Sequence, residues 1–208
     1  MADKPPGRFI AIEGIDGSGT TLQTRLLADW LTARGHSVIE TREPSRGAIG
    51  ALARERLSVR SAPLEPAALA LLFAADRLDH VAREVAPALA CGAVVLSDRY
   101  LLSSLAYQSL DCDVAWVREI NARAVQPDLT LVLEVPAEVA FARVQRRASE
   151  GGAEEERFDA LALQQRIAAN YRRFRGEPGL GPVQVIDGDQ PPEHVTAALC
   201  EALLALGL

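Results

Sequence analysis

A glycine-rich run is the part of this sequence whose residue types and spacing best suit the binding of an anion. It reads Gly14-Ile15-Asp16-Gly17-Ser18-Gly19-Thr20-Thr21 and directly follows the apolar residues 9–12. Glycines let a backbone wrap around phosphate oxygens, and the N–H groups of a following helix then point at the anion. We therefore expect a phosphate-binding loop (P-loop) at residues 14–21, with Thr21 where such a loop places a Mg²⁺ ligand.

One position departs from the signature of such loops. The pattern G-x-x-x-x-G-K-[ST] requires a lysine where this chain has Thr20. The lysine ammonium normally reaches the β- and γ-phosphates and offsets their charge, so its absence is a serious objection. Taken by itself, the run is also compatible with a structural turn after a first strand.

The elements that would position this run alternate along the chain. Apolar segments bounded by turn residues alternate with segments of helical period, which predicts an α/β fold with a parallel sheet. We expect five strands near residues 9–12, 37–41, 93–96, 129–133 and 183–186. Helices are expected near 22–31, within 48–90, in two short pieces before Pro127, after 133 and at 192–206. No linker divides the chain, so we expect one domain over residues 1–208.

Composition narrows the classes of function. The chain has 208 residues, a net charge of −6 and 49% hydrophobic residues, which favours a globular protein over one that binds nucleic acid. The first eight residues lack the apolar region of a signal peptide, and no apolar run is long enough to span a membrane. The widely separated Cys91, Cys112 and Cys200 suit reduced thiols. We expect a cytoplasmic protein without a membrane or nucleic-acid partner.

A charged segment interrupts the regular alternation. Residues 146–157 contain two glycines and no apolar stripe, and they include the three arginines Arg146, Arg147 and Arg157. A solvated loop between helices is one interpretation. A lid at about 146–158 that closes over a nucleotide is the other, and the arginines together with the phosphate loop favour it.

Five separated motifs give the chain a family resemblance over nearly its full length. In order they are Ile12-Glu13-Gly14-Ile15-Asp16-Gly17-Ser18-Gly19, Thr41-Arg42-Glu43-Pro44, Phe73-Ala74-Ala75-Asp76-Arg77, Ser97-Asp98-Arg99-Tyr100 with Ser103-Ser104-Leu105-Ala106-Tyr107-Gln108, and Pro127-Asp128-Leu129-Thr130. With these motifs the sequence resembles bacterial thymidylate kinases. The resemblance implies a P-loop nucleoside monophosphate kinase-like fold, a lid and a homodimer. It also implies transfer of the γ-phosphate of ATP to dTMP with Mg²⁺.

The resemblance also implies roles for individual residues. ATP would lie on Gly14, Ile15, Asp16, Gly17, Ser18, Gly19, Thr20 and Thr21, with Mg²⁺ near Thr21 and Asp98. Phe73 would stack on thymine, Arg77 would hydrogen-bond the base, and Asp16 would contact the 3′-hydroxyl. Arg42 and Arg99 would bind the acceptor phosphate, and Ser104, Tyr107 and Gln108 would line the nucleoside pocket. Asp98, Arg99 and the lid arginines Arg146, Arg147 and Arg157 would be catalytic. In this family, members with a glycine after the acidic residue of the loop, as Gly17 follows Asp16 here, take the catalytic arginine from the lid.

Structural interpretations of the same residues stay open at this stage. Phe73 also lies on an apolar stripe with Leu69 and Leu72 that suits a core. Asp76 and Arg77 also suit a solvated helix face or a surface ion pair, and Asp98-Arg99 a structural pair at a strand end. The ends of strands in open α/β sheets are nevertheless where such proteins bind ligands.

Three other functions also stay open. They are a kinase for another nucleoside monophosphate, a nucleotide-binding relative that transfers phosphate poorly, and a structural or partner-binding α/β protein. If the chain is an active kinase, another cation must compensate for Thr20. The candidates are Arg25, one helical turn beyond Thr21, and a lid arginine.

Overall fold

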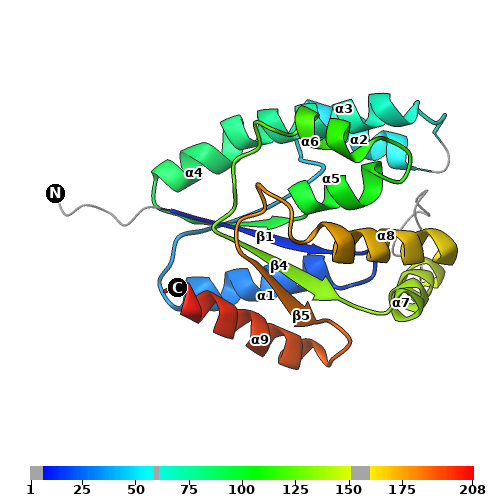
Figure 1. Cartoon of the computed structure of the whole chain (residues 1–208). Helices are drawn as coiled ribbons and strands as arrows, with labels where there is room; N and C mark the ends of the chain where they lie inside the picture. The colour runs from blue at the N-terminus through cyan, green and yellow to red at the C-terminus, as the bar shows by residue number, and fades with distance from the viewer. Residues whose placement is uncertain (1–6, 59–60, 151–159) are drawn as a thin grey trace.

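Five parallel strands form the central sheet, in the order β2-β3-β1-β4-β5 (Figure 1). The computed structural model describes residues 7–58, 61–150 and 160–208. The strands are β1 (Arg8–Gly14), β2 (Val38–Arg42), β3 (Val94–Asp98), β4 (Leu129–Glu134) and β5 (Val183–Asp187). The five-stranded parallel α/β sheet expected from the sequence is therefore confirmed.

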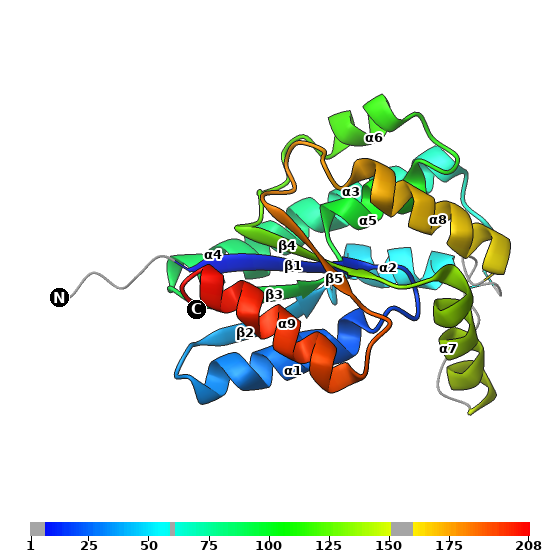
Figure 2. The same ribbon diagram turned by 60° about the horizontal axis from the view of Figure 1, so that its bottom comes forward.

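Helices cover both faces of this sheet. Figures 1 and 2 show α1 (Thr20–Ala33) and α9 (Pro192–Ala205) together on one face. The other face carries α3 (Pro66–His80), the π-helical turn η1 (Val81–Val85), α4 (Ala86–Ala90), α5 (Leu101–Gln108), α6 (Val114–Ile120) and α8 (Leu161–Phe174). Two further helices are α2 (Ala48–Leu57), which packs on α3, and α7 (Ala137–Ser149), which packs on α8.

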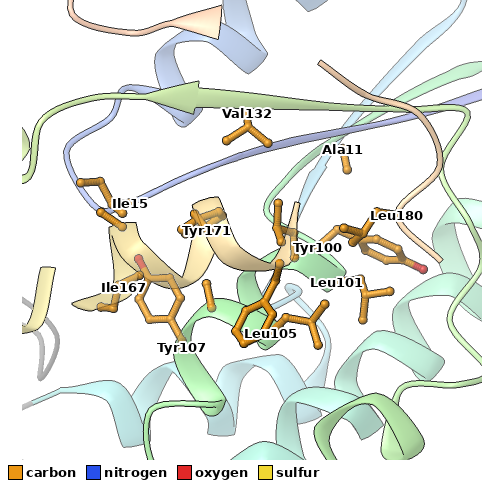
Figure 3. Packing of buried hydrophobic residues seen from close by; sticks show 14 of the residues in the cluster. Ala11, Ile15, Tyr100, Leu101, Leu105, Tyr107, Val132, Ile167, Tyr171 and Leu180 are labelled. Carbon is orange, nitrogen blue, oxygen red and sulfur yellow. The ribbon is translucent and has the colours of Figure 1, made fainter. Parts of the chain in front are cut away.

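Alternation along β1 divides its side chains between two cores. Phe9 and Ala11 belong to the cluster under α5 and α8, whereas Ile10 and Ile12 belong to the cluster under α1 and α9. Successive side chains of a strand point to opposite faces, so a strand covered on both faces is apolar throughout. Figure 3 shows the first cluster, where Tyr107 of α5 and Tyr171 of α8 lie near Ile15 of the glycine-rich run.

The strand ends that carry polar residues meet at one edge of the sheet. Asp98, the last residue of β3, is in register with Ile12 of β1 and with Arg42, the last residue of β2. In Figure 1 the strand arrows point to this edge, where α7 also lies. The connections from β1 and β3 leave on opposite faces of the sheet here, and open α/β sheets bind ligands at such a point.

The structure contains two helical features that were not predicted from the sequence. The segment expected to be a lid from about residue 146 starts as helix, because α7 continues through Ser149. Residues 151–159 lie outside the described residues, and Arg157 with them. Helix α8 is the second of these features, and its residues Ile167, Ala168, Tyr171 and Phe174 follow a helical period and are buried. Within the described ranges, no helix is long and apolar enough to cross a membrane.

Candidate active site

A cleft of about 810 Å³ opens at the edge of the sheet where β1, β2 and β3 end. One part of its lining comes from the glycine-rich run (Asp16, Gly17, Gly19, Thr20 and Thr21), and another from residues 42–44 and 98–100. Side chains from α1, α3, α5 and α7 complete the walls. Residues far apart in the sequence therefore face a single space large enough for small-molecule ligands.

The glycine-rich run joins β1 directly to the N-terminus of α1. Gly19 is the N-cap of α1 with φ of 99°, and no side chain caps this helix or places a negative charge in its first turn. The first N–H groups of α1 are therefore not bonded by a capping side chain and can bind an anion. Gly17 has φ of 84°, and a Cβ there would lie 2.2 Å from the carbonyl oxygen of Ala140 in α7. Only glycine lets the run approach α7 so closely.

Two residues of the run have buried side chains. Ile15 is buried in the hydrophobic cluster under α5 and α8, so only its backbone can face a ligand. Ser18 is also buried, and its Oγ has no hydrogen-bond partner in the described part of the chain. Gly14, Ile15 and Ser18 do not line the cleft, whereas Asp16, Gly17, Gly19, Thr20 and Thr21 do.

Thr20 occupies the position of the signature lysine and brings no charge to the cleft. Thr20 is only 5% exposed, and its carbonyl oxygen accepts a hydrogen bond of 2.8 Å from Thr24 Oγ1 within α1. The uncapped N-terminus of α1 is available to an anion, but position 20 does not supply the cation that normally accompanies it.

Thr21 and Asp98 meet at the mouth of the loop. Thr21 Oγ1 donates a 2.5 Å hydrogen bond to Asp98 Oδ2, and the other carboxylate oxygen, Oδ1, is buried without a partner among the described residues. Mg²⁺ prefers oxygen ligands and usually takes one or two carboxylates while phosphates and water complete its shell. The hydroxyl of Thr21 beside the unused oxygen of Asp98 therefore fits Mg²⁺. Such a Mg²⁺ site does not require a larger cluster of acidic residues.

Asp16 and Arg99 connect the glycine-rich run to the end of β3. Arg99 Nη2 lies 2.6 Å from Asp16 Oδ1, and the Tyr107 hydroxyl donates 2.8 Å to Asp16 Oδ2. Arg99 Nη1 also donates to the carbonyl oxygen of Gly14 and, at 3.0 Å, to the hydroxyl of Tyr171. These contacts hold a partly exposed guanidinium over the cleft, where its planar fork suits a phosphate dianion.

The backbone of Arg99 has an uncommon conformation that the surrounding structure maintains. Its φ is 79°, the one positive value for a non-glycine residue in the described ranges, and its N–H donates 2.9 Å to the carbonyl oxygen of Ile12. Such a conformation costs on the order of 1–3 kcal/mol and is concentrated at ligand sites. The conformation directs the side chain of Arg99 across β1 toward the loop, where Gly14 and Asp16 bind it.

Glu13, the residue before the loop, anchors the wall opposite it. Its carboxylate is fully buried and accepts hydrogen bonds from the backbone N–H of Tyr100 (2.9 Å) and Ser103 (3.1 Å). It also accepts from the hydroxyls of Ser103 (2.5 Å) and Tyr171 (3.0 Å). Burial raises the pKa of Glu13 above its ordinary value, although the hydrogen bonds from Ser103 act in the opposite direction. No side chain of α5 caps the N-terminus of this helix. Glu13 of β1 binds the N–H groups there instead.

The acceptor-side residues named from the sequence line the same cleft. Phe73 of α3 is half-buried there and belongs to neither hydrophobic cluster, which counts against a purely structural role. Ser104, Tyr107 and Gln108 reach the cleft from α5, and the Oε1 of Gln108 is buried without a described partner. Arg42 is exposed at the end of β2 and pairs with none of the described residues.

Arg77 is buried, so the interpretation of Asp76 and Arg77 as a solvated face or surface pair is wrong. Its Nη2 lies 2.6 Å from Glu43 Oε2 and donates 3.0 Å to both Ser104 Oγ and the carbonyl oxygen of Tyr100. Asp76 is buried as well and accepts two hydrogen bonds from Ser45. Arg77 still lines the cleft, and its Nε has no partner in the ranges described.

Helix α7 forms the wall beside the loop and contributes three arginines. Arg143, Arg146 and Arg147 line the cleft, and Arg143 Nη1 donates 3.2 Å to the carbonyl oxygen of Gly188. Arg146 and Arg147 are exposed on the last turns of the helix. Two of the three lid arginines named from the sequence therefore reach the site from a helix.

Several residues that shape the site were not identified in the sequence. Glu13 belongs to a motif that implies no role for it, and Tyr171, Arg143 and Gln164 lie outside the five motifs. Gln164 Nε2 lies 3.4 Å from Asp16 Oδ2, and Tyr171 joins Arg99 to Glu13. The helical period of α8 was an available signal for Gln164 and Tyr171, since both lie on its buried face.

The sheet order, the glycine-rich turn into α1 and the arginine-lined cleft together define a P-loop protein with the fold of nucleoside monophosphate kinases. A family model described as thymidylate kinase matches residues 12–199. The chain belongs to the thymidylate kinase family.

Individual relatives cover most of the chain. A thymidylate kinase of Leifsonia xyli subsp. xyli is 40% identical over 93% of this chain and 93% of its own length. A thymidylate kinase of Clavibacter michiganensis subsp. michiganensis is 41% identical over 97% of this chain and 98% of its own. A probable thymidylate kinase of Thermococcus onnurineus is 40% identical over 80% and 83%, respectively.

Proposed function

We propose that this chain transfers the γ-phosphate of ATP to dTMP and releases ADP and dTDP. The observation that carries the proposal is that one cleft is lined by the glycine-rich loop, by the half-buried ring of Phe73 and by several arginines. Phosphoryl transfer requires a protein mainly to align two nucleotides and to neutralise charge on the migrating group. The names of the relatives support the same reaction.

On the donor side, residues 14–21 bind the phosphates of ATP. The uncapped first turn of α1 supplies N–H donors. Thr21 and Asp98 hold Mg²⁺, for which the unused oxygen of Asp98 and the adjacent hydroxyl are suitable. The metal, when bound, neutralises negative charge on the phosphate oxygens.

On the acceptor side, Phe73 stacks on the thymine ring while Arg77 offers its free Nε to the base edge. Asp16 binds the 3′-hydroxyl, and Arg42 with Arg99 binds the phosphate of dTMP. Ser104, Tyr107 and Gln108 complete the nucleoside pocket. The hydrogen bonds from Arg99 and Tyr107 to Asp16 hold the acceptor groups in place before substrate arrives.

Arg146 and Arg147, with Arg157 from the segment outside the described residues, act as the lid arginines of this reaction. Two of them already face the cleft from α7. Closure of this wall would exclude water and bring positive charge to the phosphates in the transition state.

We further propose that the chain works as a homodimer in the cytoplasm. Leu71 and Leu78 are 49% and 41% exposed and lie two turns apart on α3, which supports a contact surface there. The three cysteines of the chain form no disulfide, which supports a reducing compartment. Light scattering on wild type and on a Leu71→Glu/Leu78→Glu variant tests the dimer. Loss of the dimer in the variant is expected, and a monomeric wild type would contradict it.

The test of the reaction is an ADP-release assay with ATP and Mg²⁺ across dTMP, dUMP, dCMP, dGMP and AMP. We expect turnover that depends on dTMP and exceeds that with each other acceptor. A preference for a different monophosphate would identify a kinase of another specificity. Binding of ATP without turnover would identify a catalytically weak relative, the alternative that Thr20 keeps open.

A further inference from the structure

Position 20 leaves the proposed ATP site without the cation of a standard phosphate loop. Thr20 is buried and uncharged, although the N-terminus of α1 that it begins has no capping side chain and can bind an anion. The lysine of the standard loop reaches the β- and γ-phosphates of the nucleotide. If this chain transfers phosphate, a different positive group must reach those oxygens.

Protein partners already hold four of the arginines that line the cleft. Arg54 donates to the carbonyl oxygens of Pro44 and Ser45, and Arg77 pairs with Glu43. Arg99 pairs with Asp16, and Arg143 donates to the carbonyl oxygen of Gly188. Moving any of these guanidinium groups to the phosphates would break contacts that organise the site.

Four other arginines line the cleft without a side-chain partner in the described ranges, namely Arg25, Arg42, Arg146 and Arg147. Arg42 ends β2, in register with Asp98 of β3. Arg146 and Arg147 lie on the last turns of α7, the helix that forms the wall beside the loop. Arg25 is the one that belongs to α1, the helix that the phosphate loop itself begins.

The position of Arg25 on α1 directs it toward the mouth of the loop. It follows Thr21 by four residues, so the two share a face of the helix and differ by about 6 Å along its axis. Helical side chains lean toward the N-terminus, which brings an extended guanidinium back to the level of Thr21. Arg25 is exposed, and its distance from the loop does not depend on any movement of α7.

We propose that Arg25 is the catalytic cation that replaces the lysine absent at position 20, and that it binds the β- and γ-phosphates of ATP. The inference rests on the proposed phosphoryl transfer. A guanidinium fork can bind two phosphate oxygens at once and is always charged, so it can supply the function of the ammonium from one turn further along the helix.

The experiment compares Arg25→Ala with Thr20→Lys and with the double variant Thr20→Lys/Arg25→Ala, in the ADP-release assay with dTMP. Loss of one group that stabilises transition-state charge typically lowers kcat by about 100- to 1000-fold, and we expect a loss of this size for Arg25→Ala. KM for dTMP should stay unchanged. Thr20→Lys returns the standard cation, so the double variant should recover to within about tenfold of Thr20→Lys.

A matched control is Arg34→Ala at the end of the same helix, where the guanidinium stacks 4.6 Å from the ring of Trp30. This variant should keep wild-type kcat. Wild-type turnover in Arg25→Ala would overturn the inference while leaving the proposed reaction intact. A loss that Thr20→Lys does not restore would also overturn it, because Arg25 would then act in some other way. An inactive wild-type protein would instead contradict the proposed reaction.

Discussion

Arg99 and Asp16 form an ion pair between the end of β3 and the glycine-rich run, with Arg99 Nη2 2.6 Å from Asp16 Oδ1. The pair connects the loop proposed to bind ATP with the wall proposed to bind the acceptor. Because Arg99 also donates to the carbonyl oxygen of Gly14, a change in either partner must affect both sides of the cleft.

Replacing Arg99 by lysine tests whether the fork geometry matters. Lysine keeps the charge but cannot bind Asp16, Gly14 and a phosphate together from one planar group. We expect kcat/KM for dTMP to fall about 100-fold, equivalent to about 2.7 kcal/mol, in steady-state kinetics with both substrates varied. A change of less than about threefold would show that charge alone suffices at this position.

Asp98→Asn tests the proposed metal site. The amide keeps the shape of the side chain but removes the charge that would bind Mg²⁺ beside Thr21. We expect the Mg²⁺ concentration needed for half-maximal activity to rise about 10- to 100-fold. Activity measured against Mg²⁺ at constant ATP checks this, with Thr21→Ser, which keeps the hydroxyl, as the matched control. An unchanged Mg²⁺ requirement in Asp98→Asn would place the metal elsewhere.

Phe73→Ala tests the proposed base contact on α3. Stacking of an aromatic side chain on a base is worth about 1–3 kcal/mol, so KM for dTMP should rise by about 5- to 150-fold. KM for ATP should not change, since Phe73 is proposed to contact dTMP and not ATP. Phe73→Tyr keeps the ring and should retain most of the affinity. Equal losses in both variants, or a loss confined to ATP, would contradict the assignment.

Glu13→Gln tests how the acceptor wall is held. Two N–H groups and two hydroxyls donate to the buried carboxylate. The amide nitrogen of glutamine is itself a donor, so it cannot accept the hydrogen bonds that the oxygen it replaces accepts. We expect the free energy of unfolding in urea to fall by about 1–3 kcal/mol. Tyr171→Phe, which removes one of the four donors to this carboxylate and one acceptor of Arg99, should cost less. A wild-type value for Glu13→Gln would mean that this network adds nothing to stability.

The same carboxyl group predicts a pH dependence. Burial raises the pKa of Glu13 above its ordinary value of 4.5, so the folded protein retains a proton there after the unfolded chain has lost it. The stability that this proton provides is full below the unfolded pKa and is lost as pH rises through the folded pKa. The free energy of unfolding of wild type minus that of Glu13→Gln should therefore decrease from pH 4.5 upward. A difference that rises over this window would contradict the raised pKa.

The sequence alone predicted those parts of the site that follow from the order of strands. Asp98 and Arg42 end parallel strands, and such ends meet at one edge, so their proximity to residues 14–21 was predictable. Phe73 could be named from its motif, although its half-buried position beside the cleft required the structure.

Other parts of the site depend on contacts that local patterns do not encode. Tyr171 lies 158 positions from Glu13, and nothing local to either residue predicts their hydrogen bond. Arg77 resembled a surface residue because its acceptors, Glu43, Asn121 and Ser104, come from three other segments of the chain. The sequence placed Arg146 and Arg147 in a lid segment and predicted no helix there, because the exposed last turns of α7 have no apolar stripe.

Separation of nucleotide products by anion-exchange chromatography tests the central claim most directly. Purified wild-type protein is incubated with ATP, Mg²⁺ and dTMP, beside a preparation of Asp98→Ala made in the same way to reveal any contaminating kinase. We predict that dTDP forms in amounts equal to ADP with wild type and is nearly absent with the variant. Folded wild-type protein that yields no dTDP, or a variant that yields as much, would contradict the claim that this chain phosphorylates dTMP.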